Sequence, residues 1–405
     1  MDNLYLEDAM PPQGLCEWET VVSSHMPHLS KPQVKVLALY SFGMAMTRSC
    51  GLTGIACFLG ELLQKKEWAL RQQLREWNYA AADKAGKKRR AVAVEGCFAS
   101  LLRWVLSWWG SEEKRLVLAL DASTLKDVFT ILAVSVVYRG CAIPVAWVIL
   151  PANEKGKWKW PWLALLRQLQ GCVPEDWTVL VLSDRGLYAR WLYRKIKRLH
   201  WHPFMRINMQ GYYRAKGEQH YLLLSGLLAE GSPEWQGEVF CFKGEARLRC
   251  TLLARWDEKH KEPWLIVTDL PPRSANAAWY GMRAWIESFF KDCKRGGWQW
   301  HCSKMSDPKR AERLWLVIAV TTLWVVSVGG EADASLPASS LELAPLPRVQ
   351  CTSRPPDKRH RPRLLSCFRR GLNIILARLL RGEGIVIGRF VPEPWPNAMP
   401  QVVSC

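Results

Sequence analysis

Short apolar runs alternate with amphipathic segments through the middle of the chain, between about residues 114 and 330. Runs of this length that are rich in Leu and Val are typical of strands buried on both faces. Helical periodicity marks residues 160–170 and 187–199, and Arg139-Gly140 is a predicted turn between two of the runs. Three strands followed by alternating helix and strand predict an α/β fold with a mixed sheet. The predicted strands are Leu116 to Leu120, Phe129 to Tyr138, Ala142 to Leu150, Thr178 to Ser183 and Phe204 to Ile207.

The segments around and within this core differ in pattern. Residues 1–113 are mostly helical by periodicity, and residues 364–405 contain a basic amphipathic helix, a short apolar strand after Gly384 and a Pro-rich tail. Residues 331–363 are rich in Pro, Ser and Arg, which is typical of a linker. Residues 210–270, inside the core, hold alternating and apolar stretches that predict further strands.

The longest apolar stretch, Leu314 to Val328, is short for a membrane span and predicts a buried helix that closes the core. The N-terminal residues are acidic and lack the pattern of a signal peptide. The 13 cysteines form no CxxC pair and no regular framework, which favours free thiols in a reducing compartment over disulfides. These patterns favour a cytoplasmic protein with no membrane partner.

Lys and Arg total 56 against 37 Asp and Glu, a net charge of +19 that suits nucleic acid or another anionic surface. The excess is clustered, with one basic block at residues 84–90 and another at residues 354–363. This clustering indicates a binding role more than solubility. Charge alone does not distinguish DNA from RNA.

Acidic residues follow two of the predicted strands. Asp121 comes directly after Leu116 to Leu120, and Asp184 directly after Thr178 to Ser183. An acid at the end of a buried strand is poorly placed for packing, although a single one commonly caps a helix or starts a turn. Both acids together with Glu287 would form converging carboxylates, whose mutual repulsion a divalent cation relieves. Hard oxygen ligands of this kind favour Mg²⁺ or Mn²⁺.

Four polar side chains share one predicted helix face in the run YGMRAWIESFFKDCK. They are Tyr280, Arg283, Glu287 and Lys294. Steps of three, four and seven residues return to the same face of an α-helix, so an aromatic hydroxyl, two cations and a carboxylate would form one stripe. Such a stripe could hold a metal ion and a phosphate side by side. A solvated, salt-bridged face is the alternative.

The Tyr-x2-Arg-x3-Glu-x6-Lys run and the DRG at Asp184 resemble the signature of bacterial DDE transposases of the insertion-sequence 4 type, over about residues 115–328. The resemblance implies an RNase H-like core with a β-rich insertion between the second acid and the Glu. It implies an N-terminal helical region that binds terminal inverted repeats, and a C-terminal dimer in a synaptic complex. The implied reaction is cut-and-paste transposition on the bacterial nucleoid: strand hydrolysis, a hairpin intermediate, and joining of 3′-ends to target DNA.

The same resemblance implies roles for individual residues. Asp121, Asp184 and Glu287 would be catalytic and would bind two divalent ions, Mg²⁺ or Mn²⁺. Five further residues would contact DNA: Tyr280, Arg283, Lys294, Trp264 and Arg185.

Two of these DNA contacts have open alternatives. Trp264 matches a family Trp that stacks on a flipped base, and a core Trp in a strand is an equal alternative. Arg185 is either a phosphate contact or a surface charge. For the whole chain, the alternatives to a transposase are an RNase H-like DNA nuclease without strand transfer, and an inactive or domesticated copy that only binds DNA.

Overall fold

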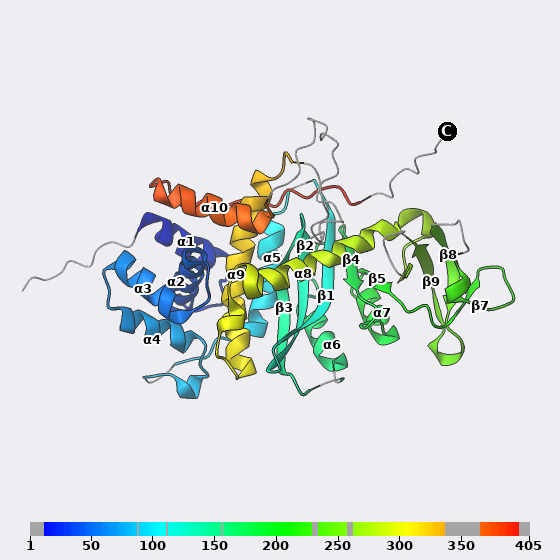
Figure 1. The fold of residues 1–405 in the computed structure, drawn as a ribbon, viewed down its shortest axis with the longest axis horizontal. Coiled ribbons are helices and arrows are strands. Elements are labelled where there is room, and N and C mark those ends of the chain that lie inside the picture. Colours follow the sequence, from blue (N-terminus) through cyan, green and yellow to red (C-terminus); the bar gives the residue numbers. More distant parts are fainter. Residues whose placement is uncertain are drawn as a thin grey trace, which may run out of the picture.

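The computed structural model describes residues 12–86, 89–110, 112–154, 156, 158–228, 234–256, 262–336 and 365–396. Within these residues, one mixed sheet has the strand order β3-β2-β1-β4-β5-β10-β9-β8-β6-β7 (Figure 1). Its first five strands are β1 (Arg115–Leu125), β2 (Phe129–Tyr138), β3 (Cys141–Pro151), β4 (Thr178–Ser183) and β5 (His202–Arg206). β1, β2 and β3 are antiparallel neighbours, and β4 and β5 run parallel to β1. The predicted α/β fold with a mixed sheet is confirmed.

The strands predicted within residues 210–270 extend the same sheet beyond β5. They are β6 (Tyr212–Ala215), β7 (Leu222–Leu223), β8 (Glu234–Cys241), β9 (Leu248–Arg255) and β10 (Trp264–Thr268). β10 pairs with both β5 and β9, so it joins this β-rich extension to the core through backbone hydrogen bonds. The extension lies at the end of the molecule opposite the N-terminal helices (Figure 1).

Helices surround the first part of the sheet. They are α1 (Gln13–His25), α2 (Lys31–Thr47), α3 (Leu52–Leu63), α4 (Glu67–Trp77), α5 (Phe98–Ser107), α6 (Lys159–Gln168), α7 (Arg190–Lys197), α8 (Trp285–Lys291), α9 (Pro308–Ala332) and α10 (Cys367–Leu380). Every residue of β2 is buried, which matches its continuous apolar sequence. Strands of this kind require cover on both faces of the sheet.

α9 is the central helix of the molecule. It contacts α2, β3 and α10, and Trp324 on it stacks on Trp18 of α1 with ring centroids 4.3 Å apart. By length and composition α9 could cross a membrane, but 94% of its most apolar 18-residue stretch is buried inside the protein. The predicted buried helix at Leu314 to Val328 is confirmed.

Three predicted boundaries are wrong. The helix predicted at residues 187–199 begins at Arg190, because a turn from Asp184 to Leu187 comes first. The strand predicted after Gly384 is a single bridge between Phe390 and Trp109. The predicted linker begins too early, because α9 runs to Ala332 and Asp333 is fully buried; residues 337–364 lie outside the described residues.

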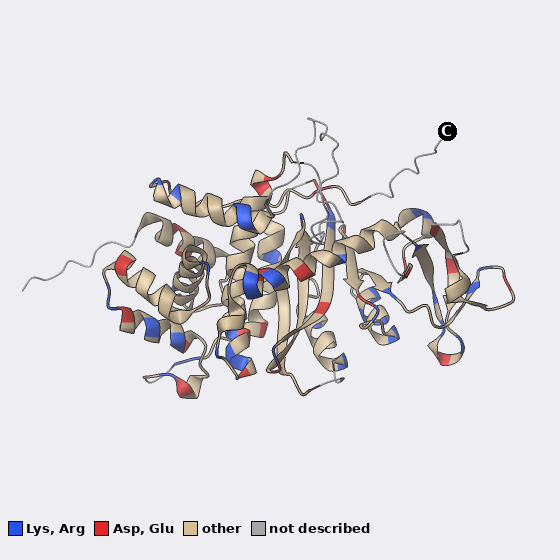
Figure 2. Cartoon of the chain, viewed as in Figure 1, with Lys and Arg blue, Asp and Glu red and all other residues tan. Residues whose placement is uncertain are grey.

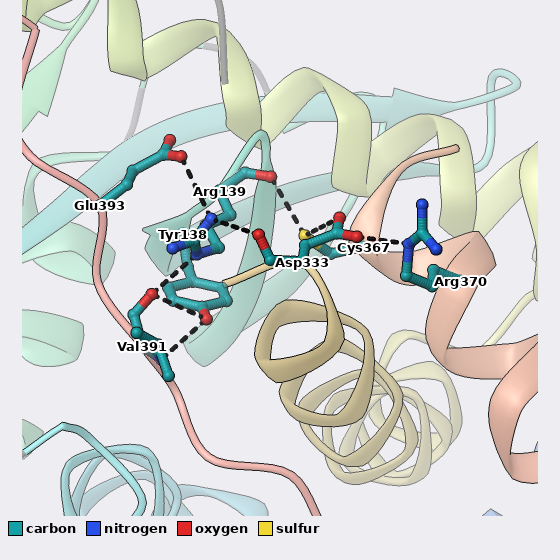
Figure 3. A network of polar contacts seen from close by, with 7 residues as sticks. All are labelled: Tyr138, Arg139, Asp333, Cys367, Arg370, Val391 and Glu393. Atoms are coloured by element: carbon teal, nitrogen blue, oxygen red, sulfur yellow. Dashed lines mark hydrogen bonds and ion pairs between the residues drawn. The ribbon is translucent and has the colours of Figure 1, made fainter. Parts of the chain in front are cut away.

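A buried polar network attaches the C-terminal segment to the sheet (Figure 3). The Arg139 guanidinium, only 4% exposed, donates to the carbonyls of Val391 (2.7 Å) and Asp333 (3.1 Å), and lies 3.7 Å from the Glu393 carboxylate. The Asp333 carboxylate pairs with Arg370 of α10. The β2–β3 turn, the end of α9, α10 and the segment at residues 391–393 therefore meet in one cluster.

Candidate functional site

Two aspartates lie side by side in the middle of the sheet. In the parallel pair β1–β4, Leu120 is opposite Ser183, so the next residues, Asp121 and Asp184, are neighbours. Asp184 directly follows β4, as predicted. The prediction that Asp121 also follows a strand is wrong: β1 continues to Leu125, because it keeps pairing with β2 as far as Phe129.

Backbone hydrogen bonds orient both aspartates. The Ala122 N–H donates to Asp121 Oδ1 at 2.9 Å, and the Leu187 N–H donates to Asp184 Oδ1 at 3.0 Å. In each carboxylate the other oxygen, Oδ2, faces the Arg283 guanidinium. In each aspartate, Oδ1 is thus held by a backbone amide and Oδ2 is directed toward Arg283.

Arg283 bridges all three predicted catalytic carboxylates. Its Nη2 lies 3.0 Å from Asp121 Oδ2 and 3.9 Å from Asp184 Oδ2, and its Nη1 lies 3.1 Å from Glu287 Oε1. Burial lowers the pKa of Arg283, but the carboxylate charges outweigh burial and raise it. Burial raises the pKa of Asp121, and Arg283 opposes that shift. The carboxylates therefore converge on one point of positive charge.

The signature run is helical, but the prediction of one regular α-helix is wrong. Tyr280 and Arg283 lie on a 3₁₀-helix (Ala277–Ala284), Glu287 lies on α8, and Lys294 lies in a π-helical turn (Asp292–Gly296). A 3₁₀-helix has three residues per turn, so Tyr280 and Arg283 are stacked on one side. The π turn, common at functional sites, widens the helix at Lys294.

The donor chemistry of this cluster suits a divalent cation. Two aspartates and a glutamate supply hard oxygens, and in this structure the Arg283 guanidinium is the cation between them. Among the described residues, no three His, Cys, Asp or Glu side chains stand close enough to hold a metal ion directly. Glu287, with 52% of its side chain exposed, is the least buried of the three carboxylates.

A cavity of about 410 Å³ opens beside the aspartates. Its walls are Asp184, Arg185, Arg206, Glu262, Trp264, Tyr280 and Arg283. Trp264 and Tyr280 meet edge to face with ring centroids 5.2 Å apart. Burial raises the pKa of Tyr280 to about 12, so its hydroxyl stays protonated and can donate a hydrogen bond at neutral pH.

Sequence reasoning missed two cavity residues, Arg206 and Glu262. Arg206 ends β5, and Glu262 comes just before β10, 56 residues later (262 − 206). The antiparallel pairing of β5 with β10 brings them together, with Arg206 Nη2 3.8 Å from Glu262 Oε2. Arg206 could have been found from the sequence, because it lies near the end of the predicted strand that pairs with β4, the strand before Asp184.

The predicted DNA-contacting residues divide into two groups. Tyr280, Arg283, Trp264 and Arg185 line the cavity, and Arg185 also pairs with Glu262 at 2.7 Å. Lys294 does not line it: its ammonium donates to Ser123 Oγ (3.0 Å) and to the Thr124 carbonyl (2.8 Å), near the end of β1. In this structure Lys294 joins the π turn to β1.

Asp292, at the start of the π turn, predicts a pH-dependent stability. Burial raises its pKa to about 7. The folded protein therefore binds this proton more tightly than the unfolded chain does, and stability falls as the pH rises through about 7. In the wild type the free energy of unfolding should fall by about 1–3 kcal/mol between pH 5 and pH 8 because of this group. Asp292→Asn should remove this fall.

Urea unfolding at both pH values measures this difference. Asp127→Asn, in the exposed β1–β2 turn, is the matched control and should leave the pH dependence of stability unchanged. A wild-type pH dependence in Asp292→Asn would contradict the prediction.

Comparison with known proteins finds a family match over part of the chain. Residues 157–324 match the family described as Transposase DDE domain; this stretch contains Asp184 and Glu287 and begins after Asp121. Among solved structures, the chain is similar to "Cryo-EM structure of piggyBac transposase synaptic complex with hairpin DNA (SNHP)", with 10% identity and a TM-score of 0.38, over 81% of this chain and 75% of that chain. No curated protein sequence matches the chain.

Proposed function

We propose that this protein is a DDE transposase of the insertion-sequence 4 type, which excises a DNA element and joins it to target DNA. The observation that carries the proposal is the convergence of Asp121, Asp184 and Glu287 within 4 Å of one guanidinium. The Transposase DDE domain match over residues 157–324 supports it independently. The basic composition suits a DNA partner.

In this proposal Asp121, Asp184 and Glu287 hold the divalent ions, Mg²⁺ or Mn²⁺. When bound, these ions activate the attacking water or 3′-hydroxyl and stabilise the leaving oxygen. The chain's own contribution is orientation: the Ala122 and Leu187 amides fix the two aspartates before DNA arrives. Preorganised ligands avoid a reorganisation cost during the reaction.

The cavity residues bind the scissile strand. Arg283 and Arg206 supply positive charge for phosphate oxygens, and the protonated Tyr280 hydroxyl donates a hydrogen bond to one. Trp264 lines the same cavity and offers a ring face to a base extruded beside the cleavage point. Lys294 acts on the site through β1, by its contacts at residues 123 and 124.

The remaining segments have proposed roles in assembly. The helices before β1 recognise the terminal inverted repeats, and α10 with the segment after it contributes to a dimer in the synaptic complex. Both roles come from the resemblance and from the basic, amphipathic character of these segments.

A cleavage and joining assay tests the proposal. Wild-type protein is incubated with DNA carrying both flanking element ends and with a supercoiled target plasmid, in Mg²⁺ and in EDTA. Hairpin-ended products and integrants that require Mg²⁺ are expected. Nicking without integrants would favour a nuclease, and salt-sensitive binding without cleavage would favour an inactive DNA-binding copy; either result would overturn the proposal.

A further inference from the structure

A row of alternating cations and aromatic rings covers the far end of the β-rich extension. Lys243 lies over the rings of Tyr212 (3.6 Å) and Tyr221 (5.5 Å), and Arg214 lies over Tyr221 (5.4 Å) and Phe240 (5.2 Å). Arg247 also lies over Phe240, at 5.4 Å. The cation–π row therefore consists of Tyr212, Lys243, Tyr221, Arg214, Phe240 and Arg247.

The contacts are concentrated in this part of the chain: of nine cation–π contacts among the described residues, five fall between residues 212 and 247. The aromatic rings hold the cations in place but leave their charge unneutralised, whereas a carboxylate would neutralise it. Lys243 and Arg247 are exposed, and the ε nitrogen of Arg214 is buried without a hydrogen-bond partner. Ordered positive charge is thus presented to solvent.

The surrounding charges keep the face basic. Lys216 and Arg249 lie beside the row and share one acid, Glu238, at 2.9 Å and 3.7 Å. Glu245 lies in the turn between Lys243 and Arg247. Among these residues, five cations stand against two acids. Figure 2 shows blue Lys and Arg positions together with red Asp and Glu positions on the extension.

Strand register places this face on the same side of the sheet as the candidate cavity. Trp264 is paired with Arg255, and Arg249 lies six positions along the same strand (255 − 249), an even number, so their side chains point to one face. Arg249 is paired with Phe240, and Phe240 with Arg214. Six residues of strand span roughly 20 Å, or about six base pairs of duplex.

We propose that the cation–π row binds the phosphate backbone of duplex DNA about six base pairs from the strand held in the cavity. This inference rests on the proposed function. The ring faces are already covered by cations, which favours phosphate contacts over base stacking. The DNA on this face is either the element end or its flank; both present the same phosphate chemistry.

Salt-dependent DNA binding tests the inference. Lys243→Gln/Arg247→Gln removes two exposed cations and leaves the cavity intact. With a labelled duplex of about 30 base pairs, each lost phosphate contact lowers the slope of log K against log salt by about 0.9, so a decrease of about 1.8 and a weakening of about tenfold are expected. Element-end DNA extended only inward or only outward identifies which duplex arm loses affinity.

Arg194→Gln/Arg198→Gln is the matched control. It makes the same charge change at two exposed arginines at the end of α7, a helix that packs against β5 and α6. An unchanged slope in the row variant, or an equal decrease in the control, would overturn the inference.

The exposed Leu222 and Leu223 lie next to the row, so anionic vesicles are a further probe. Loss of vesicle binding with intact DNA binding would assign the face to a membrane surface and also overturn it.

The two proposals fail separately. If wild-type protein shows no metal-dependent cleavage but the row variant loses its salt slope, the transposase proposal fails and the duplex-binding face stands. If cleavage occurs and the row variant binds duplex like wild type, the transposase proposal stands and the face is a solvated surface.

Discussion

Asp184→Asn is expected to reduce metal-dependent DNA cleavage by about 1,000-fold or more, because an amide supplies one neutral oxygen where the metal site needs a carboxylate. Asp121→Asn and Glu287→Gln should cause losses of similar size. DNA affinity should be unchanged or slightly higher in each variant, since a negative charge beside the phosphate is removed. Nicking of labelled DNA and fluorescence anisotropy measure the two quantities on the same preparations.

Asp176→Asn is the matched control for these substitutions. Asp176 is half exposed and pairs with Lys114 at the protein surface, so its loss should leave cleavage unchanged. Asp184 is also partly exposed, and the variant should fold normally. Undiminished cleavage by any of the three variants would remove that residue from the catalytic set.

Arg139→Ala is expected to destabilise the protein by about 3–5 kcal/mol, because it leaves buried acceptors without their charged donor. The Val391 and Asp333 carbonyls and the Glu393 carboxylate, 8% exposed, all lose their contact with this guanidinium (Figure 3). The segment that contains Val391 and Glu393 should then separate from the β2–β3 turn. Urea unfolding measures the stability, and limited proteolysis detects release of the C-terminal segment.

Arg194→Ala is the control for this effect. Arg194 is exposed on α7, and a surface substitution of this kind changes stability by less than about 0.5 kcal/mol. Equal stability of Arg139→Ala and wild type would show that the network contributes little to C-terminal docking.

The buried strands could be predicted closely from sequence. Phe129 to Tyr138 and Thr178 to Ser183 match β2 and β4, because strands covered on both faces need unbroken apolar runs that stand out from their neighbours. For β1 the sequence predicts an end at Leu120, because Asp121 breaks the apolar run. The strand continues because backbone pairing with β2 does not depend on the side chain at that position.

The sequence by itself determined the residue types of the candidate site and their spacing along the chain: two acids near strand ends, and Tyr, Arg, Glu and Lys along one helical run. The tertiary structure alone decided which of them meet. Register places Asp121 beside Asp184, burial and charge place Arg283 among three carboxylates, and strand pairing brings Arg206 to Glu262. These contacts join residues up to 162 positions apart (283 − 121), and local patterns carry no information about such distant pairs.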